Sequence, residues 1–237
     1  MNTINNIEAH NIPIKKLNPI ISPSMLSCDL GNLESECKRM VECGADWLHL
    51  DVIDGIFAPN ITFGFPVLNS IRPKVSAFFD CHCMIIDPYK YVEEFSKCGA
   101  DQMTFHVEAN IDSLEKLILK IKENNMRVGV AVKPDTFVDH TITKFLDQNL
   151  IDMILIMSVQ PGFSGQKFIE DVLPKVEDLR KNYPDLDIQM DGGVCCENVD
   201  RCAKAGANII VAGYGIFNHD NPEHAITYMR DVIKKYL

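Results

Sequence analysis

The sequence lacks both a long hydrophobic run and a recognisable targeting segment, and these two absences exclude several classes of protein. Its apolar runs are short, and Met153 to Val159 falls far below the roughly 20 residues that a membrane-spanning helix needs. The first residues contain neither the continuous apolar core of a secretory signal nor the arginine-rich bias of a transit peptide. We therefore expect a cytoplasmic protein without a membrane partner.

Basic side chains are also scarce, because 23 Lys and Arg residues face 33 Asp and Glu residues and leave a net charge of −10. Nucleic acid is a polyanion that needs a broad basic face, so we do not expect a nucleic-acid partner. A single phosphate group demands less, since the backbone N–H groups at a helix start can hold it. A small phosphorylated metabolite is compatible with this charge.

The cysteines follow no disulfide or zinc-finger pattern. They are odd in number and contain no C-x-x-C spacing. Several fall on apolar faces of predicted elements, which indicates small buried thiols in a reducing compartment rather than catalytic groups. The nine cysteines are Cys28, Cys37, Cys43, Cys81, Cys83, Cys98, Cys195, Cys196 and Cys202.

The first 18 residues are polar and aperiodic, and we expect them to form an N-terminal extension outside the core. From residue 19 to residue 237, short apolar runs rich in β-branched residues alternate with amphipathic stretches. The runs predicted as strands are Ile20–Pro23, Trp47–Val52, Ala77–Met84, Asp101–Val107, Arg127–Val132, Ile151–Val159, Asp187–Met190 and Asn208–Ala212. The helical patterns between them include Leu33–Cys43, Tyr89–Cys98, Ser113–Asn124, Phe137–Asp147, Phe168–Lys181 and Cys195–Ala205.

Three of the helical patterns end in the same way, with Gly44, Gly99 or Gly206 placed directly before a strand. Glycine at this position favours the left-handed conformation that commonly ends a helix. The repetition indicates one βα unit used many times, and strict alternation of strand and helix predicts a parallel sheet. Eight units of about 25–30 residues favour a single-domain (β/α)8 barrel, with an open doubly wound sheet as the alternative.

Polar residues occur where the strands of such a barrel end, which is where its active sites lie. Side chains alternate along a strand, so His49 and Asp51 point into the barrel while the apolar residues between them face the helices. The same parity turns His82 and Asp191 inward. Without a metal or strong mutual pairing, these buried polar groups would carry a large desolvation cost. Imidazole and carboxylate together suit zinc or another first-row divalent ion, and we predict a metal site.

Glycine-containing loops follow the last three predicted strands, at residues 158–166, 192–193 and 212–217. Glycine lets backbone N–H groups approach an anion closely, and a helix start adds a favourable dipole. A phosphate site built from the final loops and a short helix recurs in this fold. Together the three loops predict a phosphate-binding site.

Five segments resemble the ribulose-phosphate 3-epimerase family: ISPSMLSCDL, HLDVIDGIFAPNITFG, CHCMI, MSVQPGFSGQ and MDGGV. The resemblance runs from about Ile20 to the C-terminus. It implies a (β/α)8 enzyme of the pentose phosphate pathway that interconverts D-ribulose 5-phosphate and D-xylulose 5-phosphate through an enediolate.

The resemblance also implies roles for individual residues. His49, Asp51, His82 and Asp191 would bind one divalent metal, with Zn²⁺ favoured and Fe²⁺, Mn²⁺ or Co²⁺ also suited, while Asp51 and Asp191 would act as acid and base. Inversion at carbon 3 calls for two carboxylates on opposite faces of the substrate. The residues implied to contact substrate are Ser24, His82, Gly162, Phe163, Ser164, Gly165, Asp191, Gly192, Gly193, Gly213 and Tyr214.

Three positions depart from the family pattern, and none is a proposed ligand. Ile53 stands where the family often has Met, Ser164 where it usually has Gly, and Tyr214 where it commonly has Ser. Tyr214 puts a side-chain contact in doubt, although a backbone contact remains available. Met84 and Met157 point toward the site by strand parity, either as core filler or as support around the reacting carbons.

Three other functions stay open at this point. Orotidine monophosphate decarboxylase uses an array of Lys and Asp, whereas Lys is absent around His49–Asp54. Hexulose-phosphate synthase is a closer alternative, although the pairing of His82 with His49 favours the epimerase. A barrel that only binds a sugar phosphate would not need two opposed carboxylates. The sequence leaves a homo-oligomer open.

Overall fold

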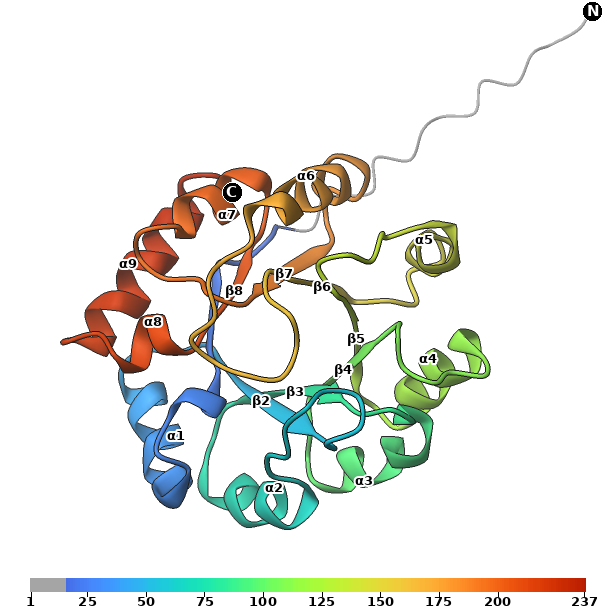
Figure 1. Cartoon of the computed structure of the whole chain (residues 1–237), viewed down its shortest axis with the longest axis horizontal. Helices are drawn as coiled ribbons and strands as arrows, with labels where there is room; N and C mark the ends of the chain where they lie inside the picture. The colour runs from blue at the N-terminus through green and yellow to red at the C-terminus, as the bar shows by residue number, and fades with distance from the viewer. Residues whose placement is uncertain (1–15) are drawn as a thin grey trace, which may run out of the picture.

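The computed structural model describes residues 16–237, in which strands alternate with helices around a central barrel (Figure 1). Residues 1–15, the greater part of the predicted extension, lie outside the described residues. The strands are β1 (Ile20–Pro23), β2 (Trp47–Ile53), β3 (Phe78–Met84), β4 (Gln102–His106), β5 (Arg127–Val132), β6 (Met153–Met157), β7 (Asp187–Asp191) and β8 (Ile209–Ala212).

The strands form one parallel sheet in the order β1-β8-β7-β6-β5-β4-β3-β2. This order follows the chain around a ring, without the reversal that defines a doubly wound sheet. Between β1 and β2 the ring is closed by a single parallel bridge from Ser24 to His49. The predicted (β/α)8 barrel is therefore confirmed, as a single domain.

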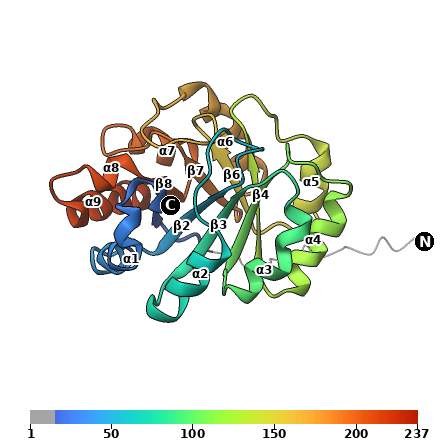
Figure 2. The ribbon, with the colours of Figure 1, turned by 60° about the horizontal axis from the view of Figure 1, so that its bottom comes forward.

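The helices surround the barrel as an outer layer (Figures 1 and 2). They are α1 (Leu33–Glu42), α2 (Phe65–Ile71), α3 (Val92–Lys97), α4 (Leu114–Glu123), α5 (His140–Leu146), α6 (Leu173–Asn182), α7 (Val199–Ala205), α8 (Tyr214–Phe217) and α9 (Pro222–Lys234). The three repeated joints behave as predicted, since Gly44, Gly99 and Gly206 have φ values of +94°, +75° and +114°. Of these helices, α2, α8 and α9 lie outside the predicted helical stretches.

Side-chain alternation divides the apolar interior into two parts. Leu48 and Leu50 of β2 face outward and are fully buried against the helices, as are Cys81 and Cys83 of β3. Burying a side chain the size of Leu contributes roughly 1.5–3 kcal/mol, so this shell holds the strands at fixed positions. Inside the barrel, an apolar cluster that includes Trp47 fills the space. The inward polar residues are thus carried by a rigid frame.

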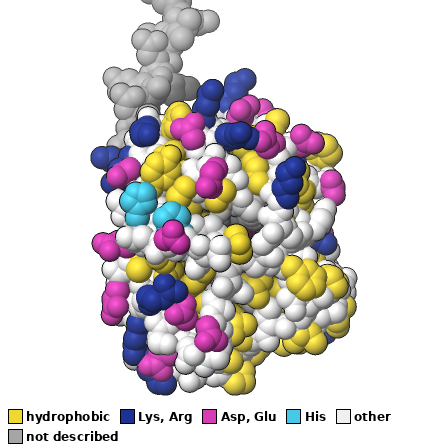
Figure 3. Space-filling model, turned by 60° about the vertical axis from the view of Figure 1, so that its left-hand side comes forward, with side chains coloured by type: hydrophobic (Ala, Val, Ile, Leu, Met, Phe, Trp, Pro, Cys, Tyr) yellow, Lys and Arg dark blue, Asp and Glu magenta, His cyan; other side chains and the backbone are white. Residues whose placement is uncertain are grey.

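The surface of the described residues carries charges of both signs. On the face shown in Figure 3, acidic and basic side chains are interspersed, and hydrophobic side chains gather toward one edge. Within residues 16–237, no helix has the length and apolar character needed to cross a membrane.

All nine cysteines are free thiols. Burial is the main cause of a raised pKa at every one of them, and it raises the pKa of Cys202 to about 12. Because the thiolate is the reactive form, these values agree with the prediction of unreactive structural cysteines.

Candidate active site

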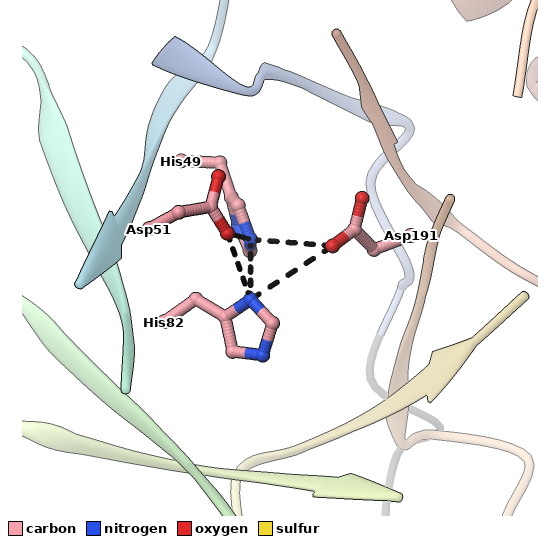
Figure 4. Close-up of side chains that lie close together, drawn as sticks. All are labelled: His49, Asp51, His82 and Asp191. Atoms are coloured by element: carbon pink, nitrogen blue, oxygen red, sulfur yellow. Dashed lines mark hydrogen bonds and ion pairs between the residues drawn. The ribbon is translucent and has the colours of Figure 1, made fainter. Parts of the chain in front are cut away.

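Four side chains converge at the C-terminal end of the barrel (Figure 4). His49 and Asp51 come from β2, His82 comes from β3, and Asp191 ends β7. One ligand atom from each lies within 4.8 Å of the other three. The convergence predicted from strand parity is confirmed, and we call these residues the four-residue cluster.

The distances within the cluster suit a small cation. The Nδ1 atom of His82 lies 3.1 Å from Nε2 of His49 and 3.0 Å from Oδ1 of Asp51. The Oδ2 atom of Asp191 lies 3.7 Å from Nε2 of His49 and 3.8 Å from Nδ1 of His82. Tetrahedral ligands about 2.0–2.2 Å from a zinc ion are separated by roughly 3.3–3.6 Å. The cluster can therefore hold a divalent metal ion with little rearrangement.

A buried carboxylate orients the first histidine. Asp80 is fully buried and accepts a hydrogen bond from Nδ1 of His49 at 2.9 Å. Gln102, Thr104 and Gln189 donate to the same carboxylate from 2.8–2.9 Å. Because Nδ1 carries the proton, the lone pair of Nε2 in neutral His49 faces the cluster beside two carboxylate oxygens. Such a convergence of acceptors calls for a cation.

The proton affinity of His49 points the same way. Burial by itself lowers the pKa of this histidine, but the carboxylates of Asp51 and Asp80 outweigh it and raise the pKa well above its usual value. A positive charge is thus favoured at the centre of the cluster, whether a proton or a metal supplies it.

The two carboxyl groups of the cluster differ from each other. Although burial opposes it, the neighbouring His49 and His82 hold the pKa of Asp51 well below its usual range. Burial raises the pKa of Asp191 to about 6, with the charge of Asp51 acting in the same direction and the histidines opposing. Ser24 donates from Oγ to Oδ2 of Asp51 at 2.6 Å, which leaves Oδ1 of Asp51 directed at the cluster.

A small cavity of about 50 Å³ lies above the cluster. Asp51 and Asp191 line it, while His49 and His82 are fully buried. Met84 and Met157 also line it, as strand parity predicted. The other predicted substrate-contacting residues in its wall are Ser24, Gly162, Phe163, Ser164, Gly165, Gly192, Gly193 and Gly213.

Backbone approaches the cavity closely at the glycines, and we call residues 162–165, 192–193 and 213 the glycine loops. Gly193 has a φ of +65°, and a Cβ atom there would lie 2.6 Å from the backbone N of Phe168 and 2.7 Å from O of Gln166. A side chain at Gly193 would push the loop after β6 out of place. Ser164 in that loop contacts the hydroxyl of Ser27, which follows β1.

Two predicted contact residues, His82 and Tyr214, do not line the cavity. His82 is buried beneath it, whereas Tyr214 points elsewhere. It is 61% exposed, and its hydroxyl accepts a hydrogen bond from Asn218 at 2.9 Å. This placement leaves the predicted backbone contact untested, and it agrees with the doubt over a side-chain contact.

The sequence reasoning missed the partners of the two histidines. Neither Asp80 nor His106 was given a role from the sequence. His106 lies 2.9 Å from His82 between their Nε2 atoms. Strand alternation predicts only which way a side chain points, whereas the pairing depends on how far neighbouring strands are staggered.

Solved structures share the fold at low sequence identity. The 3-hexulose-6-phosphate synthase from Salmonella typhimurium is 18% identical, with a TM-score of 0.68 and coverage of 92% of this chain and 100% of that chain. The orotidine 5′-monophosphate decarboxylase from Sulfolobus solfataricus is 14% identical, with a TM-score of 0.61 and coverage of 91% and 98%. At these identities the likeness shows the fold alone.

Sequence comparison is more specific. The model of the ribulose-phosphate 3 epimerase family matches residues 20–217. The ribulose-phosphate 3-epimerase of Candida glabrata is 46% identical, with 92% of this chain and 94% of that protein covered. The relative from Oryza sativa subsp. japonica, named as the cytoplasmic isoform, is also 46% identical, with 90% and 94% covered. Because these matches span nearly the whole sequence, the chain belongs to the ribulose-phosphate 3-epimerase family and is an enzyme.

Proposed function

We propose that this enzyme interconverts D-ribulose 5-phosphate and D-xylulose 5-phosphate by metal-dependent proton transfer at carbon 3. The observation that carries the proposal is the placement of two carboxylates, Asp51 and Asp191, across one buried cluster of metal-binding side chains. The family match supports the substrate, since relatives that cover most of the chain are named for it.

The opposed carboxylates suit an inversion of configuration. Asp51 stands on β2 and Asp191 on β7, and both β1 and β8 lie between these strands in the ring. A single base working from one side would return the proton to the face it left. Asp51 removes the proton from one face, and Asp191 delivers a proton to the other. The two residues exchange roles in the reverse direction.

The difference in proton affinity supports this assignment. Without a bound metal, the neighbouring histidines hold the pKa of Asp51 well below its usual range, as suits the ionised base. Burial raises the pKa of Asp191 to about 6, so Asp191 holds a proton more readily than Asp51 does. Two carboxyl groups whose surroundings separate their pKa values are a recurring arrangement for acid and base.

The four-residue cluster would hold the metal through Nε2 of His49, Oδ1 of Asp51, Nδ1 of His82 and Oδ2 of Asp191. A bound divalent ion supplies stabilisation for the negative charge that develops on substrate oxygens during proton removal. We favour Zn²⁺ for this set of two imidazoles and two carboxylates, with Fe²⁺, Mn²⁺ and Co²⁺ also suited.

The glycine loops would hold the phosphate. Gly162, Gly165, Gly192 and Gly193 all have positive φ values, and the same loops line the cavity next to the carboxylates. Exposed backbone N–H groups bind an anion without needing a basic side chain. The substrate would therefore lie with its reacting carbons over the cluster and its phosphate among the loops.

The remaining expectations stay proposals. We propose a cytoplasmic enzyme with a barrel over residues 19–237 and an N-terminal extension before it, without a nucleic-acid or membrane partner. The name of the rice relative supports the location. A homo-oligomer remains open to measurement.

The decisive experiment is turnover of D-ribulose 5-phosphate, followed by detection of D-xylulose 5-phosphate, before and after chelation. Activity should disappear when the metal is removed and return when zinc or ferrous ion is restored. Full activity after thorough chelation would support the epimerase activity and reject its dependence on a metal ion. No turnover with any divalent ion would reject the epimerase and favour an aldolase-type or binding function.

A further inference from the structure

The two histidines of the cluster are supported in different ways. His49 is held directly by the buried carboxylate of Asp80. The Nε2 atom of His82 instead lies 2.9 Å from Nε2 of a second histidine, His106, whose Nδ1 lies 3.1 Å from Oε2 of Glu108. A line of three side chains therefore leads from the cluster to the rim of the barrel.

Only one arrangement of protons fits this line with neutral imidazoles. The ionised Glu108 can only accept, so Nδ1 of His106 carries the proton and Nε2 of His106 is an acceptor. His82 must then donate from its own Nε2, which leaves the lone pair of its Nδ1 free. That atom is the one that faces His49 and Asp51.

The outer end of the line is fixed by the backbone. Oε1 of Glu108 accepts a hydrogen bond from the backbone N of Lys133 at 2.7 Å, and the Glu108 side chain is 19% exposed. The ring of Phe57 lies 4.7 Å from that of His106, and Nζ of Lys133 lies 4.2 Å from the Phe57 ring. His106 is itself fully buried, so water does not compete for its ring nitrogens.

We propose that His106 and Glu108 are positioning residues that fix the tautomer and orientation of His82, so that its Nδ1 points at the metal centre. The proposal rests on the metal site of the proposed function. His106 does not touch the cluster centre, and it acts through the hydrogen bond to His82. Partners of this kind commonly change metal affinity by about 10- to 100-fold.

The test is the zinc affinity of purified variants, measured by competition with a chelator, together with the visible spectrum of the cobalt-substituted protein. His106→Phe keeps a ring but offers no acceptor, and we expect zinc affinity to fall about 10- to 100-fold. His106→Gln can still accept through its amide oxygen and should recover much of that loss. Glu108→Gln should weaken binding by a smaller factor and shift the cobalt spectrum.

The matched control is Met103→Leu, on the outward face of the same strand β4, which should bind zinc as the wild type does. Wild-type affinity and an unchanged cobalt spectrum in both His106→Phe and Glu108→Gln would overturn the proposal. If His106→Phe fails to fold, Glu108→Gln at the partly exposed end of the line carries the test. A wild-type protein that binds zinc without epimerising would reject the proposed function. It would not contradict the positioning role of His106 and Glu108.

Discussion

The two ends of the cavity are built from different parts of the chain. At one end, the four-residue cluster consists of side chains on strands whose positions are fixed by the barrel. At the other end, the glycine loops present backbone, and several of their residues adopt φ values that other amino acids avoid. The geometry of the cluster follows from the alternation of side chains along the strands. The geometry of the glycine loops follows from backbone conformations that only residues without a Cβ atom adopt easily.

This difference determines how each end can fail. A change of a single atom in the cluster alters charge and ligand chemistry while the strand stays in place. An added methyl group in the glycine loops leaves charge unchanged but displaces backbone. The first change should mainly lower kcat, and the second should mainly raise KM, because the cluster acts through side chains and the glycine loops act through backbone.

The largest effect is expected from Asp51→Asn, which removes the proposed base and one charged ligand with almost no change of volume. We expect kcat to fall by about 10³-fold, within the range typical of general acid–base groups. Binding of inorganic phosphate at the glycine loops should change little, because the hydrogen bonds of Asp51 go to Ser24, Thr62 and His82 and not to these loops. Steady-state kinetics, zinc content and phosphate binding by calorimetry check these outcomes.

The matched control is Asp178→Asn, the same exchange at an exposed position of α6. It should leave kcat, KM and zinc content at the wild-type values. Normal turnover in Asp51→Asn would reject Asp51 as a catalytic residue, whatever happens to the zinc content.

An intermediate effect is expected from Gly193→Ala. The methyl group would lie 2.6 Å from the backbone N of Phe168, and the φ of +65° adds about 1–2 kcal/mol of strain for a residue with a Cβ atom. The loop after β6 must shift, so we expect KM to rise about 10- to 100-fold while zinc affinity stays within about threefold of wild type. Kinetics and chelator competition on the same preparation separate the two quantities.

Gly64→Ala is the appropriate comparison, since a Cβ atom at Gly64 would meet no atom within 4 Å. It should leave KM unchanged. A loss of zinc affinity in Gly193→Ala equal to its rise in KM would contradict the division into two independent ends.

The sequence predicted the strands and the cluster well because both follow from local periodicity. Every predicted strand overlaps an observed one. Strand alternation alone was sufficient to predict that four side chains converge, namely His49, Asp51, His82 and Asp191. Alternation has a period of two, so one residue decides the face without any knowledge of the neighbouring strands.

Contacts between distant loops could not be predicted in this way. Asn60 in the loop after β2 donates to the carbonyl of Gly162 at 2.8 Å, across 102 positions in the sequence. The direction of Tyr214 likewise depends on Asn218 and on the short helix α8 rather than on any repeat. The line of side chains from His82 to Glu108 depends on how β3 and β4 are staggered against each other, and only the assembled sheet defines that stagger.

The smallest effect is expected at Ser164, where the resemblance leads one to expect glycine. The hydroxyls of Ser164 and Ser27 are in contact and join the loop after β6 to the turn after β1, at the edge of the small cavity. An exposed hydrogen bond of this kind contributes about 0.5–1 kcal/mol, so Ser164→Gly should raise KM about two- to fivefold and leave kcat nearly unchanged.

A double-mutant cycle tests whether that contact is the cause. Ser27→Ala should raise KM by a similar factor, and the variant carrying both changes should be no worse than the weaker single variant, because the same hydrogen bond is lost once. Additive effects would mean that each hydroxyl acts separately, for example by contacting substrate. In that case Ser164 would belong to the binding site itself, and the glycine loops would not act through backbone alone.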